Sequence, residues 1–276
     1  MNKIKIITVV IIILLVGIFA PRLFNRPRPG DTIYVNGVHI ATNAVGAGKP
    51  VILIHGLGYS KESMSQLAEH LKQNHLVISY DVRGHGQSDK PESFTLEDHA
   101  DDLAAIIKTF KLQKPVIVGF SMGSYITLRA AEKYPDMFSK IVLIGTKGGG
   151  ETSSSQQYQN SADTIMGRVF APMTTPDAIA EFARSSASPV QLTNDQKNAI
   201  YKSLTEFDLM ADIANVKMPA LVMTGEYDGL NPPAAGKMVA ESLPDATFYV
   251  VPNAGHIAFF ENPDFVYEHI DEFLAK

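Results

Sequence analysis

The feature that most constrains the fold is the segment VIVGFSMGSYITLRAAEKYP, residues 116–135. Its apolar start predicts a buried strand, the residues from Met122 to Tyr134 predict a helix, and Ser121 lies at the junction with a glycine two positions away on each side. A strand that turns this tightly into a helix brings the two flanking positions close together, where only glycine fits without a clash. The G-x-S-x-G pattern alone is weak evidence, but its strand and helix context predicts a sharp turn with an exposed serine at the apex.

From Asp31 onward, predicted strands and helices alternate along most of the chain. Asn36-Gly37 separates two alternating runs and predicts an opening hairpin. Such alternation implies parallel strands joined by right-handed crossovers, with functional residues in the loops beyond the carboxyl ends of the strands. The predicted fold class is α/β, a mostly parallel twisted sheet flanked by helices, over residues 31–276. Later strands are predicted at residues 51–54, 76–80, 116–118, 141–144, 220–225 and 247–251.

Two helix starts carry clear local signals. Thr95 with Asp98 three residues later predicts a capped helix start. The last helix is expected to start at Asn262-Pro263. Its buried face is predicted to contain Phe265, Val266, Ile270, Phe273 and Leu274.

The alternation stops over residues 148–218. This stretch contains no convincing strand, but Thr175 before a proline, and Thr193 with Gln196 three residues later, predict helix starts. Because the stretch follows one strand and precedes the next, we interpret it as a helical cap over the loops that contain Ser121. The alternative is a surface elaboration that does not contact a substrate.

Residues 1–30 differ in kind from the rest of the chain. The segment IITVVIIILLVGIFA, residues 6–20, follows Lys3 and Lys5 and precedes an arginine- and proline-rich linker. It is shorter than the ~20 residues that span a bilayer squarely, and it lacks an A-x-A cleavage site. We expect an uncleaved N-terminal hydrophobic anchor to a membrane, with residues 31–276 on the extracytoplasmic side. A cleaved signal peptide of a secreted protein, or a buried hairpin or helix, are the alternatives.

Charge and cysteine content narrow the possible partners and chemistry. A net charge of −5 gives no reason to expect nucleic acid as a partner, because nucleic-acid binding favours a basic face. A small molecule is the expected partner. The absence of cysteine excludes disulfides, thiolate metal sites and a cysteine nucleophile.

Two later loops contain the groups that would activate Ser121. A serine hydroxyl needs a base to remove its proton, and the base needs a third group to orient it. Asp228 follows the predicted strand that ends at Gly225, and His256 follows the one that ends at Val251. Alone, Asp228 reads as a turn residue and His256 as a structural histidine. Their joint placement at the carboxyl ends of separate strands, in the order Ser, Asp, His, predicts a catalytic triad.

Acyl transfer also requires donors for the oxygen that becomes negative. The turn HGLGYS offers the backbone N–H of Leu57, and the serine turn offers that of Met122. We expect His55 to brace this turn rather than to act in catalysis. The segment DVRGHGQSDKP, residues 81–91, is interpreted as a stabilised loop near the site.

The motifs HGLG, DVRGHGQSDKP, GFSMG, GEYDGLNPP and AGHIAFFENP together resemble the α/β-hydrolase superfamily, in particular its small-esterase, enol-lactonase and cofactor-free haloperoxidase branch. The resemblance covers residues 31–276. It implies that Ser121 is the nucleophile, His256 the base and Asp228 its orienting acid, with no metal or organic cofactor. It also implies that Leu57 and Met122 donate to the oxyanion. Dehalogenases and epoxide hydrolases of similar fold have aspartate in place of Ser121, so their reactions are not implied.

The predicted function is that of a serine hydrolase that cleaves a carboxylic ester, lactone or thioester through an acyl-enzyme. The apolar residues Phe120, Ile257 and Phe259 are candidates to line a pocket for a modest hydrophobic acyl group. A carbon–carbon bond hydrolase, an aminopeptidase or a perhydrolase would use the same residues. A non-catalytic hydrolase-like receptor and a membrane scaffold with a vestigial enzyme fold are the alternatives from other classes.

Overall fold

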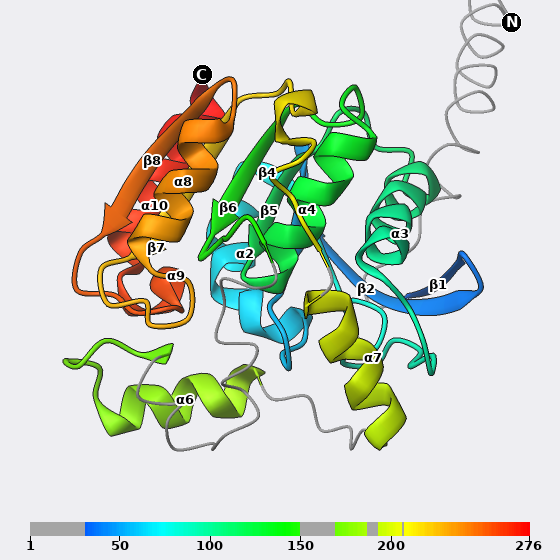
Figure 1. The fold of residues 1–276 in the computed structure, drawn as a ribbon, viewed down its shortest axis with the longest axis horizontal. Helices are drawn as coiled ribbons and strands as arrows, with labels where there is room; N and C mark the ends of the chain where they lie inside the picture. Colours follow the sequence, from blue (N-terminus) through cyan, green and yellow to red (C-terminus); the bar gives the residue numbers. More distant parts are fainter. Residues whose placement is uncertain (1–30, 150–168, 187–192, 206) are drawn as a thin grey trace, which may run out of the picture.

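The computed structural model describes residues 31–149, 169–186, 193–205 and 207–276. Within these residues, eight strands form one sheet in the order β1-β2-β4-β3-β5-β6-β7-β8. Figure 1 shows this sheet with β1 and β2 at one end and β7 and β8 at the other. Strand β2 pairs antiparallel with β1 and β4, and all other neighbours are parallel. The strands are β1 Thr32–Val35, β2 Val38–Gly46, β3 Lys49–Ile54, β4 His75–Tyr80, β5 Val116–Phe120, β6 Lys140–Ile144, β7 Ala220–Gly225 and β8 Ala246–Val251.

The predicted N-terminal anchor and its linker lie outside the described residues, as do residues 150–168 of the predicted insertion. Among the helices that the structure describes, none has the length and apolar character needed to cross a bilayer.

The opening hairpin matches the prediction from Asn36-Gly37. The backbone φ angles of these two residues are 47° and 81°. Two consecutive left-handed residues form the turn that joins strands with the natural sheet twist, and Asn-Gly is the pair that adopts it most readily. The register therefore places Val35 opposite Val38 and Thr32 opposite Ala41.

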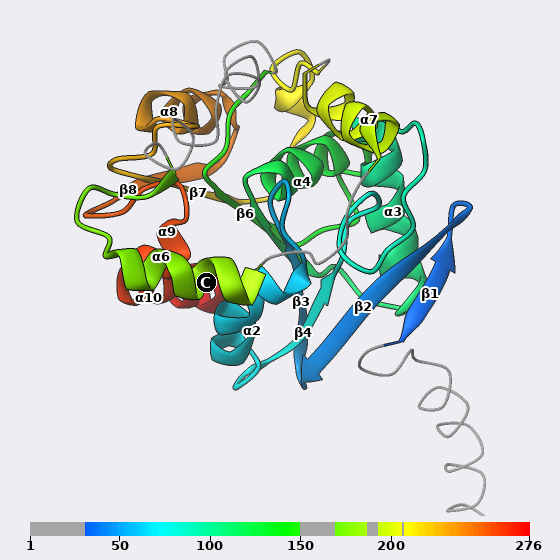
Figure 2. The same ribbon diagram turned by 90° about the horizontal axis from the view of Figure 1, so that it is seen from below.

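Helices cover both faces of the sheet, as Figure 2 shows. Successive residues of β3 point to opposite faces, so Ile52 and Ile54 join the core under α3, α4 and α8, whereas Val51 and Leu53 join the core under α2, α9 and α10. The helices are α2 Ser65–Leu71, α3 Leu96–Thr109, α4 Met122–Lys133, α6 Pro176–Ser186, α7 Asn194–Thr205, α8 Pro233–Ser242, α9 Ala258–Glu261 and α10 Pro263–Ala275, with short 3-10 helices η1 Lys61–Met64 and η3 Ile213–Asn215.

Helix α10 begins where the sequence predicts, but it buries less of its apolar face than expected. The side chain of Asn262 accepts a hydrogen bond from the N–H of Phe265 at 3.3 Å. Val266 and Ile270 are buried, whereas Phe265, Phe273 and Leu274 are only partly buried. The last turn lies at the rim of the sheet, where Lys140 donates to the carbonyl of Phe273 at 2.7 Å.

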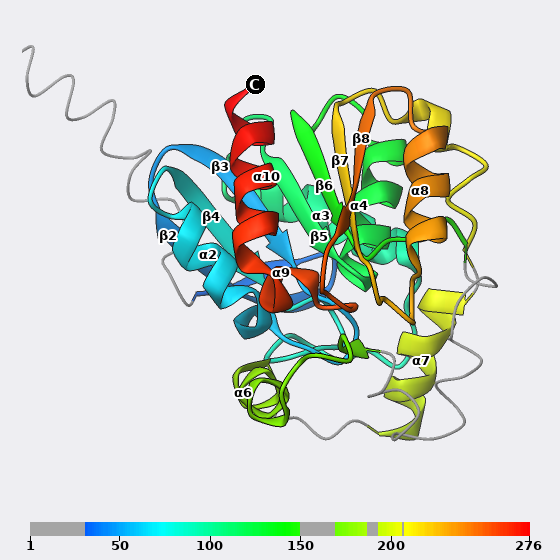
Figure 3. The same cartoon turned by 90° about the vertical axis from the view of Figure 1, so that its left-hand side faces the viewer.

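Helices α6 and α7 lie beyond the carboxyl ends of the parallel strands, as Figure 3 shows. Both follow β6 and precede β7 in the chain. The predicted capping box at the start of α7 is present, because the N–H of Thr193 donates to Gln196 at 3.0 Å and the N–H of Gln196 donates to Thr193 at 3.2 Å. These helices therefore share the edge of the sheet where Ser121 lies.

Candidate active site

The serine turn has the geometry that the two glycines predict. Ser121 joins β5 to α4 with φ 51° and ψ −116°, a conformation that costs a non-glycine residue on the order of 1–3 kcal/mol. A Cβ on Gly119 would collide with the carbonyl oxygen of Gly123, and a Cβ on Gly123 would collide with that of Ile54. The close backbone approach explains why glycine lies on each side of the serine.

The structure brings Ser121, His256 and Asp228 into one hydrogen-bonded row. The Nε2 atom of His256 lies 2.9 Å from the hydroxyl oxygen of Ser121, and its Nδ1 atom lies 2.8 Å from the Asp228 carboxylate. The carboxylate accepts the proton of Nδ1, which leaves the lone pair of Nε2 directed at the serine hydroxyl. His256 is positioned further by its own N–H, which donates to the carbonyl of Val169 at 2.6 Å.

The Asp228 carboxylate is held by more than the histidine. Its second oxygen accepts hydrogen bonds from the N–H groups of Leu230 at 2.9 Å and Asn231 at 2.8 Å. The side chain of Asn231 in turn donates to the carbonyl of Gly145 and to the hydroxyl of Tyr125, each at 2.6 Å. Asn231 therefore ties the loop after β7 to β6 and α4.

Asn231 and Gly145 were not among the site residues predicted from the sequence. Gly145 follows β6 with φ 61°, and a Cβ there would lie 3.1 Å from the imidazole of His256 and 3.4 Å from the Asp228 carboxylate. A glycine directly after a predicted buried strand was the signal for such a close approach. Asn231 had no comparable signal, because its side-chain partners are 86 and 106 residues away in the chain.

The predicted oxyanion donors lie next to the serine. A Cβ on Gly56 would lie 3.2 Å from the Cβ of Ser121, so the loop that contains Leu57 runs directly beside the nucleophile candidate. Met122 is the first residue of α4, where a backbone N–H has no acceptor within the helix. Within the described residues, neither N–H donates to another main-chain carbonyl. Their action on an oxyanion stays a prediction.

His55 braces this loop, as predicted. Its Nε2 atom accepts a hydrogen bond from the N–H of Val82 at 3.0 Å, so its Nδ1 atom carries the proton and donates to the carbonyl of Gly56 at 2.8 Å. Burial lowers the pKa of His55, which keeps the ring neutral and the tautomer fixed.

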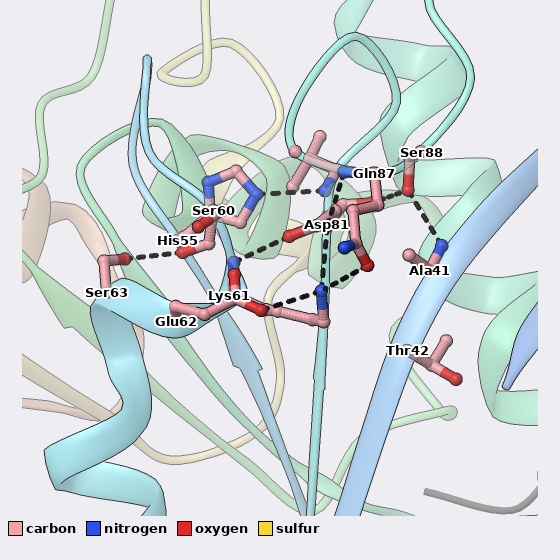
Figure 4. Close-up of polar contacts among 12 residues, drawn as sticks. Ala41, Thr42, His55, Ser60, Lys61, Glu62, Ser63, Asp81, Gln87 and Ser88 are labelled. Atoms are coloured by element: carbon pink, nitrogen blue, oxygen red, sulfur yellow. Dashed lines mark hydrogen bonds and ion pairs between the residues drawn. The ribbon is translucent and has the colours of Figure 1, made fainter. Parts of the chain in front are cut away.

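Asp81 links the same loop to the loop after β4. Its carboxylate accepts hydrogen bonds from the N–H of Lys61 at 2.7 Å, from the N–H of Gln87 at 2.8 Å and from the ammonium of Lys61 at 3.0 Å. Figure 4 shows Asp81 between Lys61 and Gln87. The loop after β4 is therefore a stabilised structural loop, as expected from its sequence.

Arg83 and His85 in that loop are also buried. The guanidinium of Arg83 donates two hydrogen bonds of 2.6 Å to Asp102 on α3. Burial, together with neighbouring His55, lowers the pKa of His85 to about 3. His85 is therefore neutral at ordinary pH.

The three pocket candidates lie in the core around the imidazole. Phe120, Ile257 and Phe259 are all buried, and the ring of Phe120 lies 5.1 Å from that of His256 and 5.0 Å from that of Phe259. Phe120 thus packs against the imidazole of His256 on the face of the sheet that α9 and α10 cover. A role for the three residues in lining a substrate pocket stays a prediction.

Helix α6 contacts this region through aromatic rings. The ring of Phe182 on α6 lies 5.3 Å from that of Tyr59 and 5.0 Å from that of Phe260. Tyr59 in turn stacks at 6.2 Å on Phe120, next to Ser121. The helix is therefore held beside the serine turn, and its action as a cap that contacts a substrate stays a prediction.

Lys147, three residues after β6, was also not predicted from the sequence. Its side chain is buried, with 3% of the residue exposed. The ammonium lies 5.3 Å from the ring centre of Tyr125 and 5.5 Å from that of Phe207. Burial lowers the pKa of Lys147 to about 8.

The described part of the chain contains no group of three or more acidic or histidine side chains that could hold a metal ion.

A serine on a strained strand-to-helix turn, with histidine and aspartate on the loops of later parallel strands, defines the class of α/β hydrolases. A protein-family model described as alpha/beta hydrolase fold matches residues 49–191 and 174–263. The chain therefore belongs to the α/β hydrolase fold family, which confirms the resemblance seen in its motifs.

Known relatives agree with this assignment. The chain is 27% identical over 261 residues to the putative non-heme bromoperoxidase BpoC of Mycobacterium tuberculosis, covering 87% of this chain and 98% of that protein. It is 28% identical over 247 residues to the 2-(acetamidomethylene)succinate hydrolase of Mesorhizobium japonicum, covering 83% and 89%. The structure of a thermophilic esterase from Thermogutta terrifontis with malate bound matches with a TM-score of 0.77 and 27% identity, covering 88% and 96%. These neighbours support a hydrolase.

Proposed function

We propose that this protein is a serine hydrolase that cleaves a carboxylic ester, lactone or thioester through an acyl-enzyme. The observation that carries the proposal is the row from Asp228 through His256 to Ser121, with contacts of 2.8 and 2.9 Å. A hydroxyl that lies at the apex of a strained turn and within hydrogen-bond distance of an oriented imidazole is arranged for attack on a carbonyl carbon.

The reaction would proceed in two halves. Ser121 attacks the carbonyl carbon while His256 takes its proton at Nε2, and the Asp228 carboxylate stabilises the resulting imidazolium. The N–H groups of Leu57 and Met122 would stabilise the negative oxygen of the tetrahedral intermediate. The intermediate expels the alcohol or thiol, which receives the proton from His256. A water deprotonated by the same histidine then attacks the acyl group, and release of the acid returns the proton to Ser121.

The ester, lactone and thioester class is favoured because a solved esterase is 27% identical to this chain over most of its length. A carbon–carbon bond hydrolase, an aminopeptidase or a perhydrolase would retain the same three side chains. A non-catalytic receptor is disfavoured, because all three groups are present and in contact.

Labelling with a fluorophosphonate probe tests the proposal. The full-length protein should be labelled, and Ser121→Ala should abolish labelling and lower ester hydrolysis by roughly 10³-fold or more. Ser242→Ala, at a partly exposed position on α8, is the matched control and should keep both signals. Labelling that survives in Ser121→Ala would contradict the role of Ser121 and point to another nucleophile. No labelling of a folded wild-type protein would contradict the proposal and favour the receptor.

We also propose that residues 6–20 attach the protein to a membrane, with the hydrolase domain on the extracytoplasmic side. The apolar run of residues 6–20 supports the attachment, whereas basic residues flank it on both sides and do not set its orientation. Alkaline extraction of membranes should leave the protein in the membrane fraction, and a reporter fused after Lys276 should report an extracytoplasmic location. Full release into the soluble fraction would exclude the anchor.

A further inference from the structure

Lys147 lies close to the residues that hold the catalytic acid. It follows β6 two positions after Gly145, which packs against both His256 and Asp228. Asn231 joins the carbonyl of Gly145 to the hydroxyl of Tyr125, and the ring of Tyr125 faces the Lys147 ammonium at 5.3 Å. The ammonium is thus separated from the support of Asp228 by a single aromatic side chain.

The segment after α7 also packs against Lys147 and the residues that follow it. The ring of Phe207 faces the ammonium from the other direction at 5.5 Å. The N–H of Leu209 donates to the carbonyl of Gly148 at 2.8 Å, and Gly149 forms an antiparallel bridge with Asp208. Lys147 therefore lies between the triad support and the inserted helices, at the carboxyl edge of the sheet where α/β folds bind ligands.

The charge of Lys147 has no counter-ion among the described residues. Among the described residues, the ammonium faces the rings of Tyr125 and Phe207 and forms no ion pair with a carboxylate. Buried lysines are almost always paired, because removal of an ammonium from water is costly. Aromatic faces offset part of that cost but accept none of the three N–H groups as a carboxylate would.

We propose that Lys147 binds an ionised carboxylate of the substrate, so that the enzyme acts on an ester, lactone or thioester that carries a second, free acid group. The proposal rests on the serine hydrolase function described above. An incoming carboxylate supplies the missing counter-ion and forms charge-assisted hydrogen bonds in a site shielded from water. Because burial lowers the pKa of Lys147 to about 8, most molecules still carry the charge at pH 7. The acyl or leaving group of such a substrate is then oriented relative to Ser121 by a fixed charge.

Kinetics with matched esters test the proposal. Monomethyl hexanedioate carries the free acid, and methyl hexanoate of the same chain length does not. Lys147→Met should lower the ratio of kcat/KM for the anionic ester to that for the neutral ester by roughly 10- to 100-fold. Lys147→Arg should restore part of the ratio. Lys237→Met, which removes an exposed lysine from α8, is the matched control and should leave the ratio unchanged. An equal ratio in the wild type and Lys147→Met would overturn the proposal.

A binding measurement without turnover separates this proposal from the proposed function. In full-length Ser121→Ala, hexanedioate should raise the melting temperature, and the added Lys147→Met substitution should remove that rise. A rise that persists in the double variant would overturn the role of Lys147, whereas fluorophosphonate labelling would still report on Ser121. Absent labelling with an intact Lys147-dependent rise would instead overturn the hydrolase and leave an anion-binding site.

Discussion

Two buried cations near the same edge of the sheet have opposite surroundings. Arg83 in the loop after β4 is 5% exposed and forms a two-point pair with Asp102. Lys147 in the loop after β6 is 3% exposed and faces two aromatic rings instead of a carboxylate. Burial alone would lower the pKa of Arg83, but Asp102, together with Asp98 and Asp101, outweighs it and the pKa is raised, whereas burial alone acts on the pKa of Lys147 and lowers it.

This difference distinguishes a loop that only supports the fold from a loop that can bind a ligand. The loop after β4 has its charges matched within the protein, because Asp81 pairs with Lys61 as Arg83 pairs with Asp102. Such a loop needs no ligand to be complete. The loop after β6 carries a charge that no carboxylate of the described residues matches, which is a state that proteins retain at sites of function.

The largest expected effect comes from breaking the paired cation. Asp102→Asn removes the two-point partner of the buried Arg83 guanidinium and leaves it the Asp98 carboxylate at 4.0 Å, so the loss should approach the roughly 3–5 kcal/mol of free energy of unfolding that a broken buried ion pair costs. Urea unfolding measures this loss. The double variant Arg83→Met/Asp102→Leu should recover most of the stability, because it removes both charges and keeps the volume. A loss well under 1 kcal/mol in Asp102→Asn would show that the pair is not structural.

Removal of the unpaired cation should raise the free energy of unfolding instead of lowering it. The pKa of Lys147 falls from 10.5 to about 8 on folding, which corresponds to roughly 3 kcal/mol against the folded state at pH 7. Lys147→Met should therefore raise the free energy of unfolding by roughly 2–3 kcal/mol at pH 7.

The pH dependence of that gain has a definite direction. Between about pH 8 and 10.5 the unfolded wild type binds more protons than the folded protein, so its stability rises with pH through this window. The advantage of Lys147→Met should shrink over the same window, as urea unfolding at pH 7, 8.5 and 10 would show. A destabilised Lys147→Met at pH 7 would mean that the ammonium is satisfied within the protein.

The features that could be predicted from the sequence are those set by a few neighbouring residues. The Asn36-Gly37 hairpin, the capping boxes at Thr95 and Thr193 and the glycines around Ser121 are each set by neighbours in the chain. The three triad candidates also could be found, because the end of a predicted strand places a residue at a known edge of a parallel sheet.

Features that depend on packing between distant parts of the chain could not be predicted from the sequence. Asn231 and Lys147 have partners from other strands and helices, and no local pattern distinguishes them from ordinary loop residues. The same reason explains the partly exposed side of α10, since apolar periodicity indicates a face but not how much sheet covers it. A buried charge without a partner can be seen only once the surrounding elements are assembled.

The smallest expected effect concerns Lys111, which destabilises the folded state through its backbone conformation rather than through its charge. Lys111 follows α3 with φ 54°, and the N–H of Leu112 donates to the carbonyl of Ile107 at 3.0 Å, which is the helix ending that favours glycine at the position of Lys111. Lys111→Gly should stabilise the protein by roughly 1 kcal/mol, since glycine adopts a left-handed conformation without the strain of a Cβ.

Because Lys111 is exposed, this gain should be the same at pH 7 and pH 10, in contrast to that of Lys147→Met. Lys111→Ala keeps a Cβ and removes the charge, so it should give little or no gain at either pH. If Lys111→Ala stabilised the protein as much as Lys111→Gly, charge rather than backbone strain would explain the cost at Lys111, and the contrast with Lys147 would fail.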